Sequence, residues 1–361
     1  MKCRISVCCG TRPEVIKMAP VIRAFKDSPS VELEFILTGQ HSDLLEGLLN
    51  SFDLKADIEL KASSLKGDLN SFSESFFQTF NSFTSKSPRP DLVLVHGDTA
   101  TSFHIGLYCF HRGIPFAHVE AGLRSGSLKD PFPEEFYRQS LSKLASFHLC
   151  TEESSRENLL NEGISKDIIS VVGNSLTDAV KSFAPSFEEG KVRRKEILVT
   201  LHRRENRDRI PFLIRALAKL AQENLDFTFI YVAHPSVDNF FSEFSFPENL
   251  KVAKPLPYPK MIDCVSKAHL IITDSAGIQE EAAIFGTPTL VCRKRTERQT
   301  PCILVGDDTE KLTYEAQKIL GNRAAPMPML NFSSSPSIKI REAILRYLEV
   351  LDESNGYRCP S

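Results

Sequence analysis

The sequence predicts an α/β protein built from two domains with parallel sheets, and three observations carry this prediction. The chain has 361 residues, more than one hydrophobic core usually covers. Short β-branched runs alternate with amphipathic stretches, which is typical of parallel strands joined by helices. Polar residues directly follow several of the apolar runs, as they do where parallel strands end at a ligand crevice.

The first half has the pattern of one Rossmann-like domain. Pro13 suits the first turn of a helix over 14–26, and a Phe-rich face predicts another helix over 69–83. A third helix is expected at 134–144. A junction near Gly173-Asn174 bounds this N-terminal domain at residues 1–173. The expected strands are 3–9, 31–37, 91–95, 115–119, 147–150 and 168–172.

The second half repeats the pattern over residues 174–337. Helices are expected at 210–222, 261–267 and 278–285. The stretch 323–337 is rich in Pro and Ser and is interpreted as a linker. The helix after it, 338–352, either caps the chain or packs back on the N-terminal domain. The expected strands are 196–201, 227–232, 250–253, 270–273 and 289–292.

Composition excludes several classes of protein. A net charge of -2 argues against a nucleic-acid-binding surface, which would be basic. No apolar run is long enough to span a bilayer. The nine cysteines are scattered and include no Cys-x-x-Cys pair. They are therefore expected to be buried thiols in a reducing cytoplasm, and neither disulfides nor a metal site is expected.

Carboxylates stand at the ends of neighbouring expected strands. Asp98 follows the run that ends at Val95, and Glu120 ends the next one. Glu134 opens the helix that comes after them. Since the carboxyl ends of parallel strands share one edge of a sheet, these three acids are predicted to converge on one crevice. The nearby His96 and His118 are interpreted as structural or peripheral.

Three further motifs suit an anion. The turn from Gly10 to Glu14 opens a helix and carries Arg12, with Lys17 about one turn on. Ser275-Ala276-Gly277 opens another helix after a strand, and Glu281 lies one turn further, suited to the hydroxyls of a ribose. The alternative for both motifs is a capped helix start without a ligand.

The third motif, His202-Arg203-Arg204, ends the first strand of the second half. The alternative there is a solvated loop with weak ion pairs.

Together these segments resemble the non-hydrolysing UDP-N-acetylglucosamine (UDP-GlcNAc) 2-epimerases, from the first strand to about Arg298. The resemblance implies two Rossmann-like, doubly wound domains that face each other across a cleft in a GT-B-like arrangement. It also implies UDP-GlcNAc and UDP-N-acetylmannosamine (UDP-ManNAc) as substrates, no cofactor and no metal, and a homodimer.

The family's site residues fall on matching positions of this chain. The resemblance assigns catalytic roles to Asp98, Glu120, Glu134 and His202. It assigns substrate contacts to Arg12, Lys17, Arg138, Ser275, Ala276, Gly277, Glu281 and Arg298.

The chain departs from the family pattern at four places. Ala276 replaces a usual glycine, which is acceptable if φ at Ala276 is helical. Gln299 follows Arg298 where the family has proline, and Ser42 follows His41 where it has arginine. Residues 61–70 contain no match for an arginine associated with activation by a second substrate molecule.

Three other functions fit the same motifs. A hydrolysing epimerase would release free N-acetylmannosamine (ManNAc). A GT-B glycosyltransferase would need an acceptor groove and leaves the paired carboxylates unexplained. A sugar-nucleotide sensor without catalysis would have no need of those carboxylates.

Overall fold

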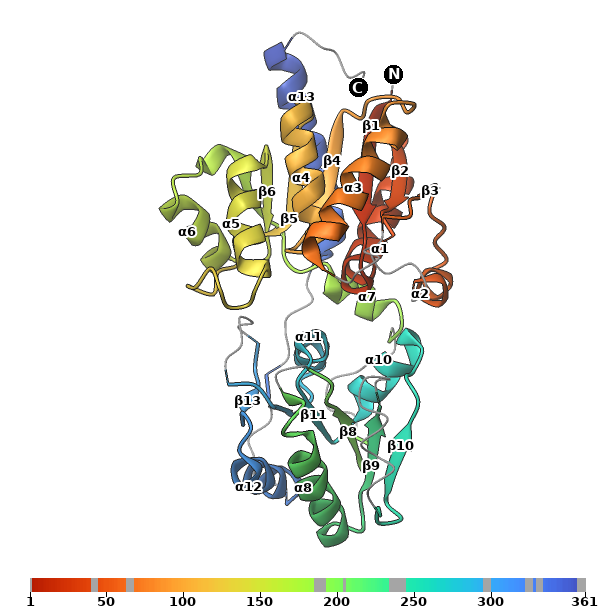
Figure 1. Ribbon diagram of the computed structural model, residues 1–361, viewed down its shortest axis with the longest axis vertical. Coiled ribbons are helices and arrows are strands. Elements are labelled where there is room, and N and C mark those ends of the chain that lie inside the picture. Colours follow the sequence, from red (N-terminus) through yellow and green to blue (C-terminus); the bar gives the residue numbers. More distant parts are fainter. Residues whose placement is uncertain are drawn as a thin grey trace. The chain divides into compact units, whose positions relative to one another are not determined.

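The computed structural model describes residues 2–39, 45–62, 68–184, 193–203, 206–233, 245–294, 300–321, 327–328 and 334–355. The chain forms two compact units (Figure 1). Unit 1 comprises Met1–Ala179 with Ser334–Ser361, and unit 2 comprises Val180–Ser333.

Unit 1 is organised around a parallel sheet with the strand order β3-β2-β1-β4-β5-β6-β7. The order reverses between β1 and β4, which places a topological switch point there. All five residues of β4 are buried, as expected for a strand covered on both faces. The strands are β1 (Cys3–Cys9), β2 (Val31–Leu37), β3 (Ile58–Glu59), β4 (Leu92–His96), β5 (Phe116–Ala121), β6 (Phe147–Cys150) and β7 (Ile169–Val171).

Helices cover both faces of this sheet. Figure 1 shows α3 and α4 in front of it and α13 behind it. Helix α3 buries Phe72, Phe76 and Phe80, which share one helical face against the strands. The helices are α1 (Arg12–Lys26), α2 (Glu46–Ser51), α3 (Leu69–Thr84), α4 (Ala100–Arg112), α5 (Glu134–Leu144), α6 (Glu153–Asn161), α7 (Leu176–Lys181) and α13 (Pro336–Asn355).

The C-terminal helix α13 packs on unit 1. Tyr347 stacks on Phe147 of β6 with 4.7 Å between ring centroids. Arg341 donates to the carbonyl of Ala24 in α1 at 3.3 Å. The Asp178 carboxylate accepts from Ser337 N at 2.8 Å and so ties the start of α13 to α7.

Unit 2 repeats the design with a second parallel sheet, in the order β10-β9-β8-β11-β12-β13. Its switch point therefore lies between β8 and β11. The strands are β8 (Glu196–Thr200), β9 (Thr228–Val232), β10 (Leu250–Ala253), β11 (Leu270–Thr273), β12 (Thr289–Val291) and β13 (Ile303–Leu304). The helices are α8 (Ile210–Glu223), α10 (Tyr258–Lys267), α11 (Ala276–Ile284) and α12 (Thr309–Leu320).

The predicted fold class is confirmed, and each predicted strand and helix has a counterpart. Helices α2, α4, α6, α7 and α12 and the short strands β3 and β13 were not predicted. The expected domain boundary was residue 173, whereas unit 1 continues to Ala179. The expected linker 323–337 lies mostly outside the described residues, and α13 begins at Pro336.

Two further sequence expectations concern cysteines and membranes. The expectation of thiols throughout is wrong at Cys3, which is disulfide-bonded. Seven other cysteines in the described residues are free, and all but Cys302 are buried. A search of the described helices finds none with the length and apolarity to cross a membrane.

Candidate functional site

Glu120 stands at the carboxyl end of β5 in a strained backbone conformation. Its φ of 63° is in the left-handed region, which non-glycine residues rarely adopt. The pairing of β5 with β6 shifts register between Val119 and Ala121, so Glu120 forms a bulge. Bulges and strained residues cluster at functional sites because they re-aim a side chain.

The Glu120 carboxylate is buried with a cation. Glu120 is 5% exposed and forms an ion pair with Lys17 of α1, itself 5% exposed. His96 Nε2 lies 3.5 Å from Glu120 Oε2. His96, interpreted from the sequence as structural or peripheral, therefore belongs to this cluster. Residues from α1, β4 and β5 meet here because the ends of β1, β4 and β5 are adjacent.

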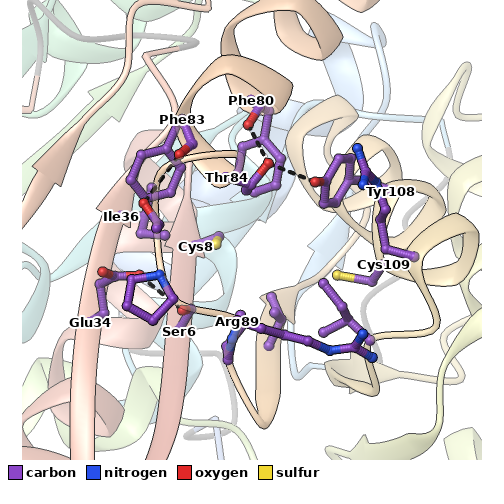
Figure 2. A pocket seen from close by; sticks show the side chains of 16 residues that line it. Ser6, Cys8, Glu34, Ile36, Phe80, Phe83, Thr84, Arg89, Tyr108 and Cys109 are labelled. Atoms are coloured by element: carbon purple, nitrogen blue, oxygen red, sulfur yellow. Dashed lines mark hydrogen bonds between the residues drawn. The ribbon is translucent and has the colours of Figure 1, made fainter.

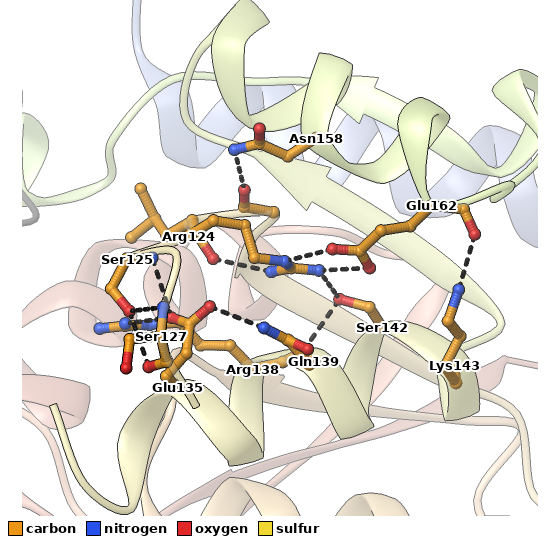
Figure 3. A network of polar contacts seen from close by, with 12 residues as sticks. Arg124, Ser125, Ser127, Glu135, Arg138, Gln139, Ser142, Lys143, Asn158 and Glu162 are labelled. Atoms are coloured by element: carbon orange, nitrogen blue, oxygen red, sulfur yellow. Dashed lines mark hydrogen bonds and ion pairs between the residues drawn. The ribbon is translucent and has the colours of Figure 1, made fainter. Parts of the chain in front are cut away.

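Asp98 follows β4 and faces α5. Arg138 Nη2 of α5 lies 2.5 Å from Asp98 Oδ2, and Arg138 is 3% exposed. The same guanidinium donates through Nη1 to Glu135 at 2.9 Å. Glu135 is fully buried and also accepts from Ser125 N at 3.1 Å, as Figure 3 shows. Glu135 therefore fixes Arg138, and Arg138 fixes Asp98.

Arg124 ties the same region to α6. Its guanidinium binds both carboxylate oxygens of Glu162, at 2.6 and 2.9 Å, and Ser142 of α5 at 2.8 Å (Figure 3). This contact and that of Lys143 lower the pKa of Glu162, the hydrogen bond from Arg124 being the largest cause. The loop after β5 is thereby held to α5, the helix that carries Glu134 and Arg138.

Glu14 is a buried carboxylate for which no role was predicted from the sequence. Its Oε2 accepts from Gly10 N at 2.9 Å and from Thr11 N at 2.7 Å. Its Oε1 accepts from the hydroxyls of Thr99 at 2.6 Å and Ser102 at 3.0 Å. Glu14 thus joins the loop after β1 to the loop after β4, across the switch point.

A signal for Glu14 was present in the sequence. Thr11 and Glu14 have the spacing of a capping box, in which the acid bonds the backbone of the cap. Arg12, between them, is exposed at the start of α1. Fixing Thr11 and Glu14 therefore fixes the backbone from which the Arg12 side chain extends.

Glu134 opens α5 and is half-buried. Burial raises the pKa of the neighbouring Tyr137, and the charge of Glu134 adds to this rise. The structure thus links Asp98 to α5 through Arg138 and places Glu134 on that helix.

Unit 2 has a matching arrangement at its own switch point. Asp274, fully buried after β11, accepts from the backbone N–H groups of His202 and Arg203, each at 3.0 Å. Asn206 donates to the same carboxylate at 3.0 Å. His202 Nδ1 lies 3.6 Å from Asp274 Oδ1, and the His202 side chain is 37% exposed. Asp274, also missed by the sequence analysis, therefore holds the loop that presents His202.

Helix α11 begins at this point. Ser275 is its N-cap and accepts from Ile278 N at 3.5 Å. Ala276 is the first helical residue, and positive φ at described non-glycine residues occurs only at Asp53 and Glu120. The expectation of an ordinary φ at Ala276 is confirmed. Glu281, one turn along, is 5% exposed. Arg298, with His41, lies outside the described residues.

Gly277 has open space where a side chain would be. A Cβ built there meets only Ser275 Oγ, at 3.8 Å. The fold of the chain therefore does not require glycine at this position. A ligand that approaches the backbone would require it.

Two buried histidines lie under the unit 1 site. His118 and His148 are register partners on β5 and β6, and His118 Nε2 contacts the carbonyl of Gly97 at 2.7 Å. Burial lowers the pKa of His118 to about 4 and that of His148 to about 3. The unfolded chain takes up these protons near pH 6.5, whereas the folded chain does not.

The contribution of these two neutral histidines to the free energy of unfolding is therefore expected to be fully present above pH 6.5 and to be lost as the pH falls below it. Each histidine lowers the free energy of unfolding by about 1.4 kcal/mol per pH unit below that point. Urea unfolding of the His148→Leu variant between pH 6.5 and 4.5 should show a slope shallower by that amount than wild type. Identical slopes would rule out the buried, neutral His148.

The described residues contain no group of three or more His, Cys, Asp or Glu arranged to hold a metal ion. The carboxylates at the unit 1 site instead have cationic partners on their own chain, Lys17 for Glu120 and Arg138 for Asp98. Each of these two carboxylates is therefore held in place by a cation of its own chain.

Comparisons with known proteins agree on one family. The family model described as UDP-N-acetylglucosamine 2-epimerase matches residues 23–336. The UDP-N-acetylglucosamine 2-epimerase of Salmonella borreze is 38% identical over 309 residues, 80% of this chain and 81% of that protein. A probable UDP-N-acetylglucosamine 2-epimerase of Ralstonia nicotianae is 35% identical over 345 residues, 89% of this chain and 92% of that protein.

A solved structure gives the same result in three dimensions. The crystal structure of the Neisseria meningitidis UDP-GlcNAc 2-epimerase bound to UDP-GlcNAc matches with a TM-score of 0.83 and 31% identity. The match covers 95% of this chain and 100% of that chain. The chain therefore belongs to the UDP-N-acetylglucosamine 2-epimerase family.

Proposed function

We propose that this protein interconverts UDP-GlcNAc and UDP-ManNAc by inverting C2 of the sugar, without net hydrolysis. Its family and a relative solved with UDP-GlcNAc support the substrate. The observation that carries the chemistry is Glu120, a buried acid on a strained bulge beside Lys17 and His96. A sensor that only bound UDP would gain nothing from that strain.

The first step is departure of UDP. The C2 proton is not adjacent to a carbonyl, so its direct removal is slow. When the C1–O bond breaks, UDP takes the bonding electron pair and the sugar becomes oxocarbenium-like, which acidifies the C2–H bond. A base then removes the proton, and its electron pair forms the C1=C2 double bond of a 2-acetamidoglucal. Stabilising the departing diphosphate is therefore the largest catalytic demand.

The second step returns UDP to C1 and a proton to C2. A single group on one face would regenerate the starting epimer, so two groups on opposite faces are needed. We assign them to the set Asp98, Glu120 and Glu134. Lys17 and Arg138 hold Glu120 and Asp98 in fixed positions.

We assign diphosphate binding to cations and to a helix start. The N–H groups at the start of α11, from Ser275 to Gly277, suit a phosphate because they point out of a helix N-terminus. His202, presented by Asp274, adds a hydrogen-bonding side chain, and the exposed Arg12 adds a positive charge. Glu281 and Arg298 are proposed to contact the nucleoside.

Gly277→Ala is expected to move stability and substrate binding in opposite directions. Alanine is favoured over glycine in a helix by up to about 1 kcal/mol, and open space surrounds the position. The free energy of unfolding should therefore rise, while the added methyl group raises KM for UDP-GlcNAc about tenfold or more. Urea unfolding and initial rates measure the two effects. An unchanged KM would remove Gly277 from the binding site.

Incubation with UDP-GlcNAc in D2O, followed by NMR, tests the function. The proposal predicts UDP-ManNAc with deuterium at C2, together with deuterium in the remaining UDP-GlcNAc. Free ManNAc would indicate a hydrolysing epimerase. Transfer that requires an added acceptor would indicate a glycosyltransferase. An unchanged substrate that still binds would indicate a sensor.

We further propose that the enzyme works as a homodimer in the cytoplasm. The family resemblance supports the dimer. The seven free cysteines of the described residues favour a reducing compartment, whereas the disulfide at Cys3 counts against it. Sedimentation at micromolar concentration measures the oligomeric state, and a monomeric active enzyme would contradict the dimer.

A further inference from the structure

Unit 1 contains a pocket that the proposed reaction does not use. Its volume is about 270 Å³, near the lower limit of small-ligand sites. Pro88–Pro90 of its rim precede β4, and Ile114 precedes β5. The proposed catalytic residues follow these strands. The pocket therefore lies at the opposite end of the sheet from Asp98 and Glu120.

The interior of this pocket is apolar and already formed. Cys8, Ile36 and Val93 provide its floor on three strands, and each is at most 4% exposed. Phe80 of α3 and Ile114 add apolar walls. The Thr84 and Tyr108 hydroxyls bond each other at 2.6 Å, so they place no unsatisfied polar group in the interior. These walls fit a flat apolar ring.

Opposite charges stand on two sides of the pocket. Figure 2 shows Glu34 and Ser6 on one side, and Arg89 extending toward Cys109 on the other. Glu34 accepts from the Ser6 hydroxyl at 3.1 Å, and Arg89 donates to the carbonyl of Gly113 at 2.6 Å. Arg112 donates to the Asn81 amide at 3.4 Å.

The groups that hydrogen-bond to Glu34, Arg89 and Arg112 are neutral. Within the described part of the chain, Glu34, Arg89 and Arg112 have no ion-pair partner. A carboxylate and two guanidinium groups that line one pocket without compensating each other favour a ligand that brings both charges.

We propose that this pocket binds a small zwitterion with an apolar ring, an ammonium group at one end and a carboxylate at the other. The ammonium group faces Glu34, and the carboxylate faces Arg89 and Arg112. The ring lies over Ile36 and Val93. This site is separate from the epimerase function, and its test does not depend on activity.

The probe is 4-(aminomethyl)benzoate, with benzylamine and benzoate as analogues that keep one charge each. Methyl NMR of the full-length chain should show perturbation of Ile36, Val93 and Ile114. A ligand of this size is expected to bind with a Kd of about 1 mM. Each analogue should bind about tenfold more weakly, because it loses one charge-assisted contact.

Substitutions at the two charged sides of the pocket test which residue binds the ammonium group and which binds the carboxylate. Glu34→Gln should weaken the zwitterion about tenfold and leave benzoate unchanged, whereas Arg89→Met should weaken benzoate and leave benzylamine unchanged. Glu32→Gln is the matched control, because Glu32 lies two residues away on β2, pairs with Arg4 and does not line the pocket. Absence of methyl perturbation at 10 mM probe, or equal effects of Glu32→Gln and Glu34→Gln, would overturn the proposal.

Discussion

Glu120→Gln is expected to lower kcat for epimerisation by about a hundred- to ten-thousandfold, the range for loss of a general acid or base. The same change removes the charge that faces the buried Lys17. Breaking a buried ion pair on one side typically costs about 3–5 kcal/mol of stability. The single variant should therefore lose both activity and stability, as measured by steady-state kinetics and urea unfolding.

A double variant separates these two effects. Lys17→Met combined with Glu120→Gln removes both charges and should recover most of the lost stability, because no uncompensated cation remains at Lys17. Activity should stay low, since the proton-transfer group is still absent. Recovery of activity together with stability would mean that Glu120 serves the fold alone.

Glu14→Ala is expected to have the second-largest effect, although Glu14 is not proposed to touch the substrate. It leaves the buried N–H groups of Gly10 and Thr11 without their acceptor and removes the acceptor that lies 2.6 Å from the Thr99 hydroxyl. The Ser102 hydroxyl keeps the carbonyl of His96 as its acceptor, at 2.6 Å. Each buried donor without a partner costs about 1–3 kcal/mol. The loops that carry Arg12 and Asp98 would then lose their shared anchor, and kcat should fall about a hundredfold.

Conservative changes test whether Glu14 acts by positioning. Glu14→Gln keeps one oxygen for the backbone of Gly10 and Thr11, and its amide can donate to the hydroxyls of Thr99 and Ser102. It should therefore retain most of the activity that Glu14→Ala loses. Glu32→Gln is the control for a change of charge at a surface acid of the same unit. Equal losses for the Gln and Ala variants would contradict the positioning role.

Much of the site was predictable because strand ends follow a simple rule. Asp98 and Glu120 follow apolar runs, and parallel strands that are neighbours bring their carboxyl ends together. Ser275 follows another such run and has the chemistry of a helix cap. The fold class was predictable from the same alternation of strands and helices.

The partners of these residues were not predictable from the sequence. Glu120 pairs with Lys17 across more than a hundred residues, an ion pair that no local pattern encodes. The bulge at Glu120 depends on the register between β5 and β6, which belongs to the sheet and not to either strand. Helix α4 was not predicted, although its N-cap Thr99 is a residue type that favours a helix start. The β-branched and aromatic residues Ile105, Tyr108 and Phe110 within it are also common in strands.

The roles of the buried carboxylates Glu14 and Asp274 were not predicted, for a related reason. Glu14 and Asp274 each bond a loop that follows a different strand, so their importance depends on which strands are adjacent. The strand order places β1 beside β4 and β8 beside β11. The strand order must therefore be known before Glu14 and Asp274 can be recognised as residues that join two loops across a switch point.

The central claim is that UDP leaves the sugar before the C2 proton moves. UDP-GlcNAc labelled with ¹⁸O in the bridge between C1 and the β-phosphorus tests this claim directly. If UDP departs and returns, the label in recovered UDP-GlcNAc should move from the bridging position to the non-bridging oxygens of the β-phosphate, as seen by ³¹P NMR. Formation of UDP-ManNAc while the label stays entirely in the bridge of both epimers would contradict the account.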